Sequence, residues 1–187
     1  MRCHMKLTYY KKFLLTLIFT LVTPSYADTE LIGGEVNFHG VVVALPCSVG
    51  PGGDKLMIDF GKVSIKTLYS AQKTVAVPFS IPLENCSTGT YKTVSITFSG
   101  IESGELPNHI AISPAAPATT SGVAVALENE KGNLIELNKE TVVTAISEGA
   151  MSLNFQAAIV GEPTAIDQKT IEPGEFTAIA YYILSYQ

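Results

Sequence analysis

The sequence predicts an all-β sandwich in a single domain, and three observations support this prediction. Roughly eight to ten short apolar segments alternate between two faces and are separated by turns rich in glycine and proline. No segment keeps an apolar period of 3.6 residues for more than about two turns, so long helices are not expected. No internal repeat or low-complexity linker divides the chain, so one domain preceded by an N-terminal arm is the simplest organisation.

The expected strands follow one another along the chain after residue 30. Strands are predicted at residues 31–45, 56–60, 75–83, 91–99, 109–113, 122–127, 134–137, 142–146, 151–160 and 176–186, with a short strand or turn at residues 63–69. Pro78 and Pro82 fall within one of these strands. Because proline has no N–H group to donate to a ladder, that strand should lie near an edge or a kink.

The first predicted strand is long and carries a single charged residue, Glu35. Every second position shares one face in an extended chain, and on one face these positions are Ile32, Gly34, Val36 and Phe38. A strand of this kind associates with other chains if it is left unpaired, so it must pair with something. We expect it to divide near residue 40, with residues 41–45 forming the first strand of the domain itself.

The N-terminal 27 residues have the composition of a secretory signal peptide. Basic residues precede the apolar run at residues 13–22, and small residues close the segment at Ser25 and Ala27. The apolar run is shorter than the ~20 residues that a membrane-spanning helix needs, which disfavours the alternative of an N-terminal anchor. The chain is therefore expected to be exported.

Charge argues against nucleic acid as a partner. The whole sequence has 12 basic and 17 acidic residues, and the segment before residue 28 holds four of the basic residues and none of the acidic ones. The remainder carries eight lysines and no arginine, for a formal charge of −9. With no basic run and no tryptophan, a surface for nucleic acid or anionic membrane is not expected.

Two cysteines, Cys47 and Cys86, remain once the N-terminal segment with Cys3 is removed. An even pair in a secreted domain is most simply a disulfide. A metal site would need more ligands, and His39 and His109 have no neighbour at ligand spacing, so we interpret both histidines as surface residues.

The sequence contains none of the common catalytic motifs that were considered. The sequence lacks G-x-S-x-G, H-E-x-x-H, C-x-x-C and a glycine-rich phosphate loop, and its carboxylates are scattered singly along predicted turns. Such carboxylates are more simply interpreted as solvated surface charges than as a general acid and a general base. We therefore expect no enzymatic activity and no cofactor.

The segment at residues 176–186 is the most strand-like in the chain, and both of its faces are apolar. One face carries Ala180, Tyr182, Leu184 and Tyr186, and the other carries Ile179, Tyr181 and Ile183. Such a strand is either central in a sandwich or covered by a partner molecule. The pattern alone leaves open the alternative of an internal strand in a complete sandwich.

In this order, the motifs resemble the polymerising subunits of chaperone–usher pili, in particular the type 1-like fimbrial subunits. The resemblance covers nearly the whole chain after the signal peptide. The motifs that carry the resemblance are GGEVNFHGVV at residues 33–42 leading to Cys47, DFGKV at 59–63, PFSIPLENC at 78–86, LNFQA at 153–157, and the C-terminal run from Gly174 through the penultimate Tyr186.

The resemblance implies an incomplete immunoglobulin-like sandwich that lacks its last strand. Residues 28–39 would form a donor arm, with Ile32, Gly34, Val36 and Phe38 as donor residues, and residues 40–187 would form the pilin domain. The groove that accepts a neighbour's arm would involve Gly174, Ala180, Tyr182, Leu184 and Tyr186. The implied partners are a periplasmic chaperone, an outer-membrane usher and neighbouring subunits, in a fimbria on the cell surface that contributes to adhesion.

Two functions of different class are therefore compared. In the first, the chain is a structural subunit that donates its arm to a neighbour and accepts another copy's arm. In the second, it is a self-contained secreted immunoglobulin-like module or adhesin that binds a ligand through its loops. The second predicts a monomer that folds and stays soluble without a chaperone. The sequence identifies no host receptor and does not distinguish a major from a minor subunit.

Overall fold

The computed structural model describes residues 33–42, 44–114 and 122–187. The predicted signal peptide and Ile32 lie outside the described residues. The chain divides into two units, residues 1–42 and 43–187, and each is considered by itself. In the first unit, the described residues 33–42 form no helix or strand, and their side chains are exposed.

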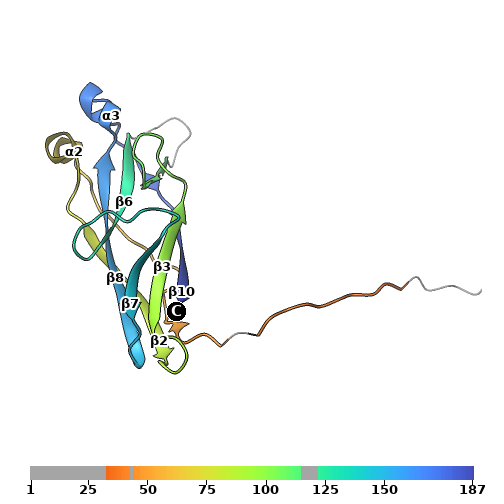
Figure 1. Ribbon diagram of the computed structural model, residues 1–187. Helices are drawn as coiled ribbons and strands as arrows, with labels where there is room; N and C mark the ends of the chain where they lie inside the picture. The colour runs from red at the N-terminus through yellow and green to blue at the C-terminus, as the bar shows by residue number, and fades with distance from the viewer. Residues whose placement is uncertain (1–32, 43, 115–121) are drawn as a thin grey trace, which may run out of the picture. The chain divides into compact units, whose positions relative to one another are not determined.

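The second unit is a sandwich of antiparallel sheets, which confirms the predicted fold class (Figure 1). A five-stranded sheet has the order β1-β2-β8-β6-β4, a three-stranded sheet the order β10-β3-β7, and β5 pairs with β9. The strands are β1 (Ser48–Val49), β2 (Val77–Cys86), β3 (Thr93–Gly100), β4 (His109–Ala111), β5 (Ser113–Pro114), β6 (Val123–Asn129), β7 (Glu140–Ala145), β8 (Gly149–Gly161), β9 (Phe176–Thr177) and β10 (Ala180–Tyr186).

The hydrophobic core lies between the two larger sheets. Phe155 of β8 is 2% exposed, and its ring meets Phe98 of β3 edge-on at 5.1 Å between centroids. On its own sheet, Phe155 lies opposite Phe79 of β2, with 5.7 Å between the rings. Alternate residues of β2, β3 and β8 are buried around these rings, because the strands present every second side chain to the opposing sheet.

The prediction of a short strand or turn at residues 63–69 was wrong. Residues Ile65–Ala71 form the helix α2, and Pro163–Gln168 form a second helix, α3, that was not predicted. In α2, the apolar side chains of Ile65, Leu68 and Tyr69 have the i, i+3, i+4 spacing of one helical face, and Leu68 is fully buried. Both helices are two turns or shorter, so a periodicity search finds too few residues to identify them.

Along most of its length, the proline-containing strand β2 has a long neighbouring strand on one side only. Pro78 and Pro82 pair with Gln156 and Ser152 of β8. On the opposite side, β1 pairs only with Leu83 and Glu84. The predicted position of this segment near an edge is therefore confirmed, because the only strand beyond it is β1, which has two residues.

Three further strand predictions differ from the structure. Residues 134–137 form no strand, and only Leu134 makes an isolated bridge, to Glu128. Residues 56–60 show the predicted alternation of half-buried and exposed side chains, but they belong to no ladder in the described part of the chain. The expected first strand at residues 41–45 is also absent from the described residues of that segment, and the first strand is instead β1. These differences arise because apolar alternation reports which side chains face a core and does not report whether the backbone has a partner.

Candidate functional site

Among the described residues, the C-terminal strand β10 is paired along one edge only. Its partner is β3, in a register that runs from Ala180 opposite Gly100 to Tyr186 opposite Val94. Backbone hydrogen bonds continue to Gln187, whose N–H donates to the Thr93 carbonyl at 3.0 Å. Within the residues that the structure describes, no strand pairs with the other edge of β10. That edge therefore presents backbone N–H and C=O groups to a further strand.

The inner face of β10 is only half covered. Tyr182, Leu184 and Tyr186 are half-buried and pack against the core, and they lie opposite the fully buried Phe98, Ile96 and Val94 of β3. Ala180 belongs to the same face and is exposed. The prediction that these four residues share one face agrees with the register, and their incomplete burial leaves apolar surface for another molecule.

The two tyrosines of this face titrate above their usual range. Burial raises the pKa of Tyr182, and the Asp54 carboxylate raises it further. Burial also raises the pKa of Tyr186, with a smaller contribution from Tyr182. Both effects favour the neutral phenol, so the face stays uncharged at ordinary pH.

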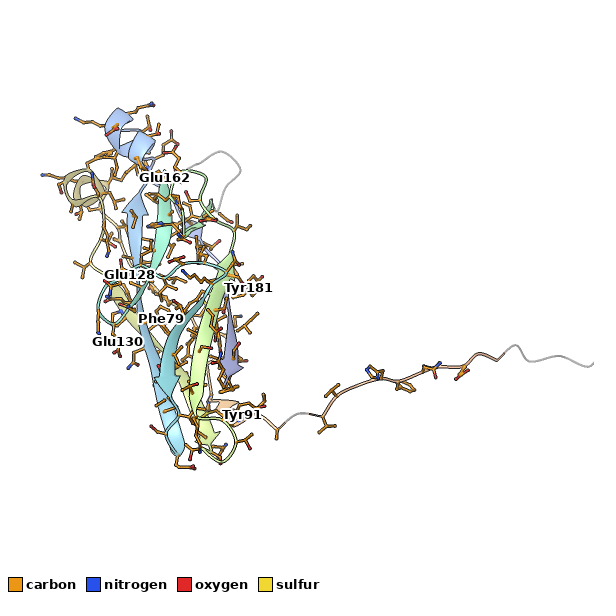
Figure 2. The ribbon with its side chains drawn as sticks, in the orientation of Figure 1. Phe79, Tyr91, Glu128, Glu130, Glu162 and Tyr181 are labelled. Carbon is orange, nitrogen blue, oxygen red and sulfur yellow. A yellow bond between two sulfur atoms is a disulfide. The ribbon has the colours of Figure 1, made fainter. Side chains whose placement is uncertain are left out.

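The outer face of β10 is exposed rather than covered. Ile179, which precedes the strand, and Tyr181 and Ile183 within it are 64%, 65% and 62% exposed. Tyr181 lies along the edge of the three-stranded sheet in Figure 2. The apolar character of both faces, which suits a central strand, occurs here on an edge strand.

A second element borders the unpaired edge of β10. The hydroxyl of Tyr182 donates a hydrogen bond to the Gly53 carbonyl oxygen at 2.7 Å. The ring of Phe60 lies 6.5 Å from that of Phe176, which precedes β10. Residues 53–60 thus run beside the strand without forming a ladder in the described part of the chain. We call the region bounded by β10 and residues 53–60 the open side of the sandwich.

Between these two contacts, the segment turns apolar side chains toward the core. Leu56 and Phe60 are half-buried and pack against the core cluster, whereas Met57 between them is 86% exposed. The alternation in the sequence indicated this inner face. It did not indicate that the segment would lie beside β10, because the contact between Gly53 and Tyr182 joins positions 129 residues apart.

The predicted donor residues that the structure describes belong to the first unit. Gly34, Val36 and Phe38 lie in the extended, exposed first unit, with Val36 71% and Phe38 94% exposed. Ile32 lies outside the described residues. The donor and acceptor roles of these residues therefore stay predictions.

Gly174, which the resemblance placed with the acceptor residues, does not lie in β10. It belongs to an exposed stretch that ends where β9 begins. Its predicted role in accepting a strand stays a prediction, and the residues that border the open side in the structure are those of β10 and of residues 53–60.

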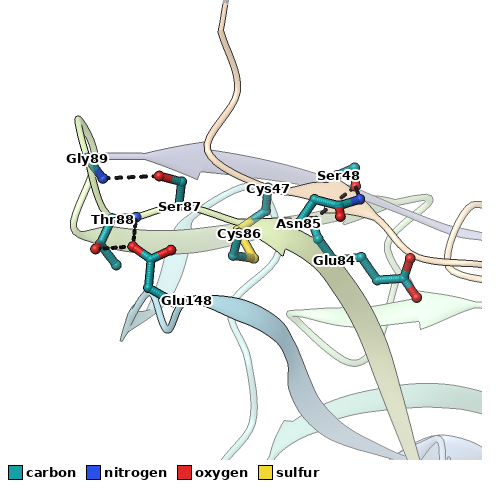
Figure 3. Close-up of a disulfide and its surroundings, with 9 residues drawn as sticks. All are labelled: Cys47, Ser48, Glu84, Asn85, Cys86, Ser87, Thr88, Gly89 and Glu148. Atoms are coloured by element: carbon teal, nitrogen blue, oxygen red, sulfur yellow. Dashed lines mark hydrogen bonds between the residues drawn. A yellow bond between two sulfur atoms is a disulfide. The ribbon is translucent and has the colours of Figure 1, made fainter.

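The predicted disulfide between Cys47 and Cys86 is present (Figure 3). It joins the residue before β1 to the last residue of β2, and the Ser87 N–H donates to the Pro46 carbonyl at 2.8 Å beside it. On the far side of the bridge, the Glu148 carboxylate accepts hydrogen bonds from the backbone N–H of Thr88 at 2.7 Å and from its hydroxyl. The disulfide and the hydrogen bond from Ser87 to Pro46 fix the start of the domain against the sheet.

The described residues contain no candidate metal site and no candidate membrane-spanning helix. No group of three or more histidine, cysteine or acidic side chains there is arranged to hold a metal ion. None of the helices in that part of the chain is both long enough and apolar enough to cross a membrane.

Known proteins were compared with this chain. The family model described as fimbrial protein matches residues 36–187. A protein named as a minor fimbrial subunit, PmfF of Proteus mirabilis (strain HI4320), is 39% identical over 173 residues, which are 92% of this chain and 95% of PmfF. The major MR/P fimbria protein of the same strain is 34% identical over 155 residues, which are 82% of this chain and 84% of that relative.

The fold is similar to that of a solved pilin. The crystal structure of the P pilus rod subunit PapA matches with a TM-score of 0.65 at 21% sequence identity, covering 76% of this chain and 100% of the PapA chain. At this identity the likeness concerns the fold, and it confirms the predicted pilin-type sandwich.

Proposed function

Because this chain belongs to the fimbrial protein family, whose members are subunits of chaperone–usher pili, we propose that its N-terminal arm and its open side form one polymerising contact. It is a structural, non-enzymatic protein that assembles with other subunits into a surface pilus. In the proposed contact, the arm at residues 28–39 of one subunit adds a strand beside β10 in the domain, residues 40–187, of the next. Strand addition of this kind is recognised in pilins as donor-strand complementation.

The unpaired edge of β10 is the observation that carries the proposal. An added strand would pair with the free backbone groups of β10 and cover the half-buried Tyr182, Leu184 and Tyr186. Burying the exposed Val36 and Phe38 of the arm would contribute roughly 1.5–3 kcal/mol each. A self-contained binding module would instead be expected to have β10 covered by its own chain.

The geometry of the contact favours a filament. Donor and acceptor surfaces differ, so each subunit offers its open side to one neighbour and its arm to another. A head-to-tail contact of this kind does not close on itself and extends into a fibre. The same arrangement places every subunit of the fibre in the role of both donor and acceptor.

The open side needs cover before assembly, because an unpaired edge with apolar side chains is an aggregation site. We propose that a periplasmic chaperone covers β10 after export and that an outer-membrane usher receives the complex. The predicted signal peptide at residues 1–27 supports passage through the periplasm.

The test is to alter the two faces of the arm separately, with the chaperone co-expressed. Val36→Asp with Phe38→Asp places charges on the proposed donor face, and we expect fibres to be lost while the chaperone complex still forms. Glu35→Gln with Asn37→Ser changes only the opposite face and is the matched control, which should still form fibres. Fibres from the first variant, or from a chain lacking residues 28–38, would show that the arm is not the donor.

A further inference from the structure

A pocket of about 420 Å³ lies against strands β2 and β8 of the five-stranded sheet. Neither β10 nor residues 53–60 line it, so it is separate from the open side. Its volume falls within the range of about 300–1,000 Å³ that is usual for small-molecule sites. The residues around it therefore decide which class of ligand it suits.

The floor of the pocket is set by the register of two strands. Ser80 of β2 lies opposite Asn154 of β8, and Pro78 lies opposite Gln156. Because side chains alternate between the two faces of a sheet, these four residues share the face opposite to that of the buried Phe155. Gln156 is half-buried and the other three are exposed. The strand pair thus presents a hydroxyl group and two amide groups side by side.

The turn that follows β6 contributes the wall of the pocket and carries Glu130. The side-chain oxygen of Asn129 accepts hydrogen bonds from two backbone N–H groups of this turn, each at 3.0 Å. The Asn129 carbonyl accepts from the Gly132 N–H at 2.9 Å and from the Gln156 side-chain amide at 3.2 Å. The turn is therefore fixed internally and to the floor. Glu130 and Phe79, which both line the pocket, are labelled in Figure 2.

The charges around the pocket disfavour ionic ligands. Among the described residues that line it, Glu130 has the only charged side chain. The nearby carboxylate of Glu128, which lies opposite Gln156 on β6, is already paired with Lys73. An anionic ligand would meet the Glu130 carboxylate with no lining cation to offset it. A metal cation would find one carboxylate where it needs several oxygen ligands.

We propose that this pocket binds a neutral, hydroxyl-rich ligand, namely a sugar ring of the hexose class. Sugar hydroxyls both donate and accept hydrogen bonds, and so do the Ser80 hydroxyl and the Asn154 amide. The Glu130 carboxylate accepts hydrogen bonds only, and it is matched by hydroxyl donors. A purely apolar ligand would instead leave the polar groups of the floor without partners. The exposed ring of Pro78 offers apolar surface to the C–H groups of a sugar.

The fibre gives such a site its effect. A pocket that is open to solvent and has few polar groups binds one sugar ring weakly. Each subunit of a fibre carries one copy of the pocket, so a surface that displays many sugars engages several copies at once. Linked sites of this kind exceed the affinity of a single site by about 10²–10⁴-fold.

Saturation-transfer difference NMR on purified fibres measures this binding with free glucose, galactose and mannose as probes. At least one of the three hexoses should receive saturation from the fibre. The matched charged probe is the uronic acid of the same hexose, in which a carboxylate replaces the CH₂OH group. It should bind about tenfold more weakly or worse, because its charge meets that of Glu130.

Variants on the exposed face of the sheet locate the site. Ser80→Ala with Asn154→Ala removes two hydrogen-bonding groups from the floor and should lower the affinity about tenfold or more. Ser152→Ala changes the same face of β8 outside the pocket and should leave binding unchanged. Thermal unfolding of each variant checks that its fold is retained.

A charge exchange tests the role of the wall. Glu130→Gln should narrow the preference for the hexose over its uronic acid, whereas the exposed Glu136→Gln should not. Absence of binding by all three hexoses would overturn the proposal, as would unchanged binding in the variant of Ser80 and Asn154. A uronic acid that binds the unmodified fibre as tightly as its hexose would overturn it without recourse to any variant.

Discussion

The strands β8 and β10 both turn apolar side chains toward the core but have different surroundings. The 13-residue β8 is paired with β2 on one side and β6 on the other, whereas the seven-residue β10 has β3 alone in the described structure. Leu153, Phe155 and Ala157 of β8 are at most 3% exposed, while the inner residues of β10 are only half-buried. The comparison teaches that the inner face of β10, whose other edge has no partner strand in the described residues, lacks cover that the inner face of β8 has.

The largest expected effect is the loss of a core ring from the fully enclosed strand. Phe155→Ala in β8 should lower the free energy of unfolding by about 3–5 kcal/mol, because the ring contacts both Phe98 and Phe79 and leaves a cavity between the sheets. Urea unfolding followed by circular dichroism measures this change. A loss below about 1 kcal/mol would mean that β8 is not the rigid centre of the sandwich.

A smaller effect is expected beside β8, where β6 is buried on both faces. Glu128 of β6 has a side chain only 6% exposed, and its carboxylate forms an ion pair with the Lys73 ammonium group. Lys73→Met leaves that carboxylate buried without its cation and should cost about 1–3 kcal/mol.

The matched control for this ion pair is the exposed pair of Lys139 and Glu136, whose side chains are 64% and 56% exposed. Lys139→Met should change the free energy of unfolding by no more than about 0.5 kcal/mol, because water already screens the pair. Equal losses from the two lysine variants would contradict a special role for burial at Glu128.

On β10, the expected effect depends on whether a strand has been added. Leu184→Ala removes a half-buried side chain and should cost about 1 kcal/mol in the chain alone. With a bound peptide of the arm sequence, the same residue becomes fully enclosed, and the loss should rise toward the 2–5 kcal/mol that is usual for core leucines. Thermal unfolding with and without the peptide measures both values. An equal loss in the two states would show that the strand does not cover Leu184.

The smallest effect is expected at the start of β8, where pH is the variable. Hydrogen bonds from the side chain and then the backbone of Thr88 hold the pKa of the Glu148 carboxyl below its ordinary value of 4.5. A lowered folded pKa stabilises the fold above pH 4.5, and this contribution is lost as the pH falls through the folded pKa. Thr88→Ala should therefore lower the Tm at pH 7 and have less effect at pH 3. A Tm difference independent of pH would contradict the assignment.

Most strands were predictable because their residues show local alternation. The strand predicted at residues 151–160 is β8, and the one at 91–99 is β3, each within a few residues of its bounds. The helix α2 was not predictable, because seven residues give less than two full apolar repeats and allow a strand as readily. The even pair of cysteines was sufficient for the disulfide between Cys47 and Cys86.

For the candidate site, the apolar face of Tyr182, Leu184 and Tyr186 was predictable from alternation, but its second border was not. Gly53 lies in a turn of glycines and proline with no pattern that separates it from its neighbours. Its buried position and its bond to Tyr182 depend on how a loop after β1 packs against the last strand. A contact between residues 129 positions apart leaves no pattern in the sequence around either residue.

The sequence by itself determined most of the strands, which face of each is apolar, and which family the chain resembles, because these properties depend on residue type and spacing along a short stretch. Only the tertiary structure decided that β10 has a partner on one side and that residues 53–60 lie beside its other edge unpaired. The physical reason is that an apolar pattern reports the preference of side chains for a core, whereas backbone pairing depends on which distant segments meet.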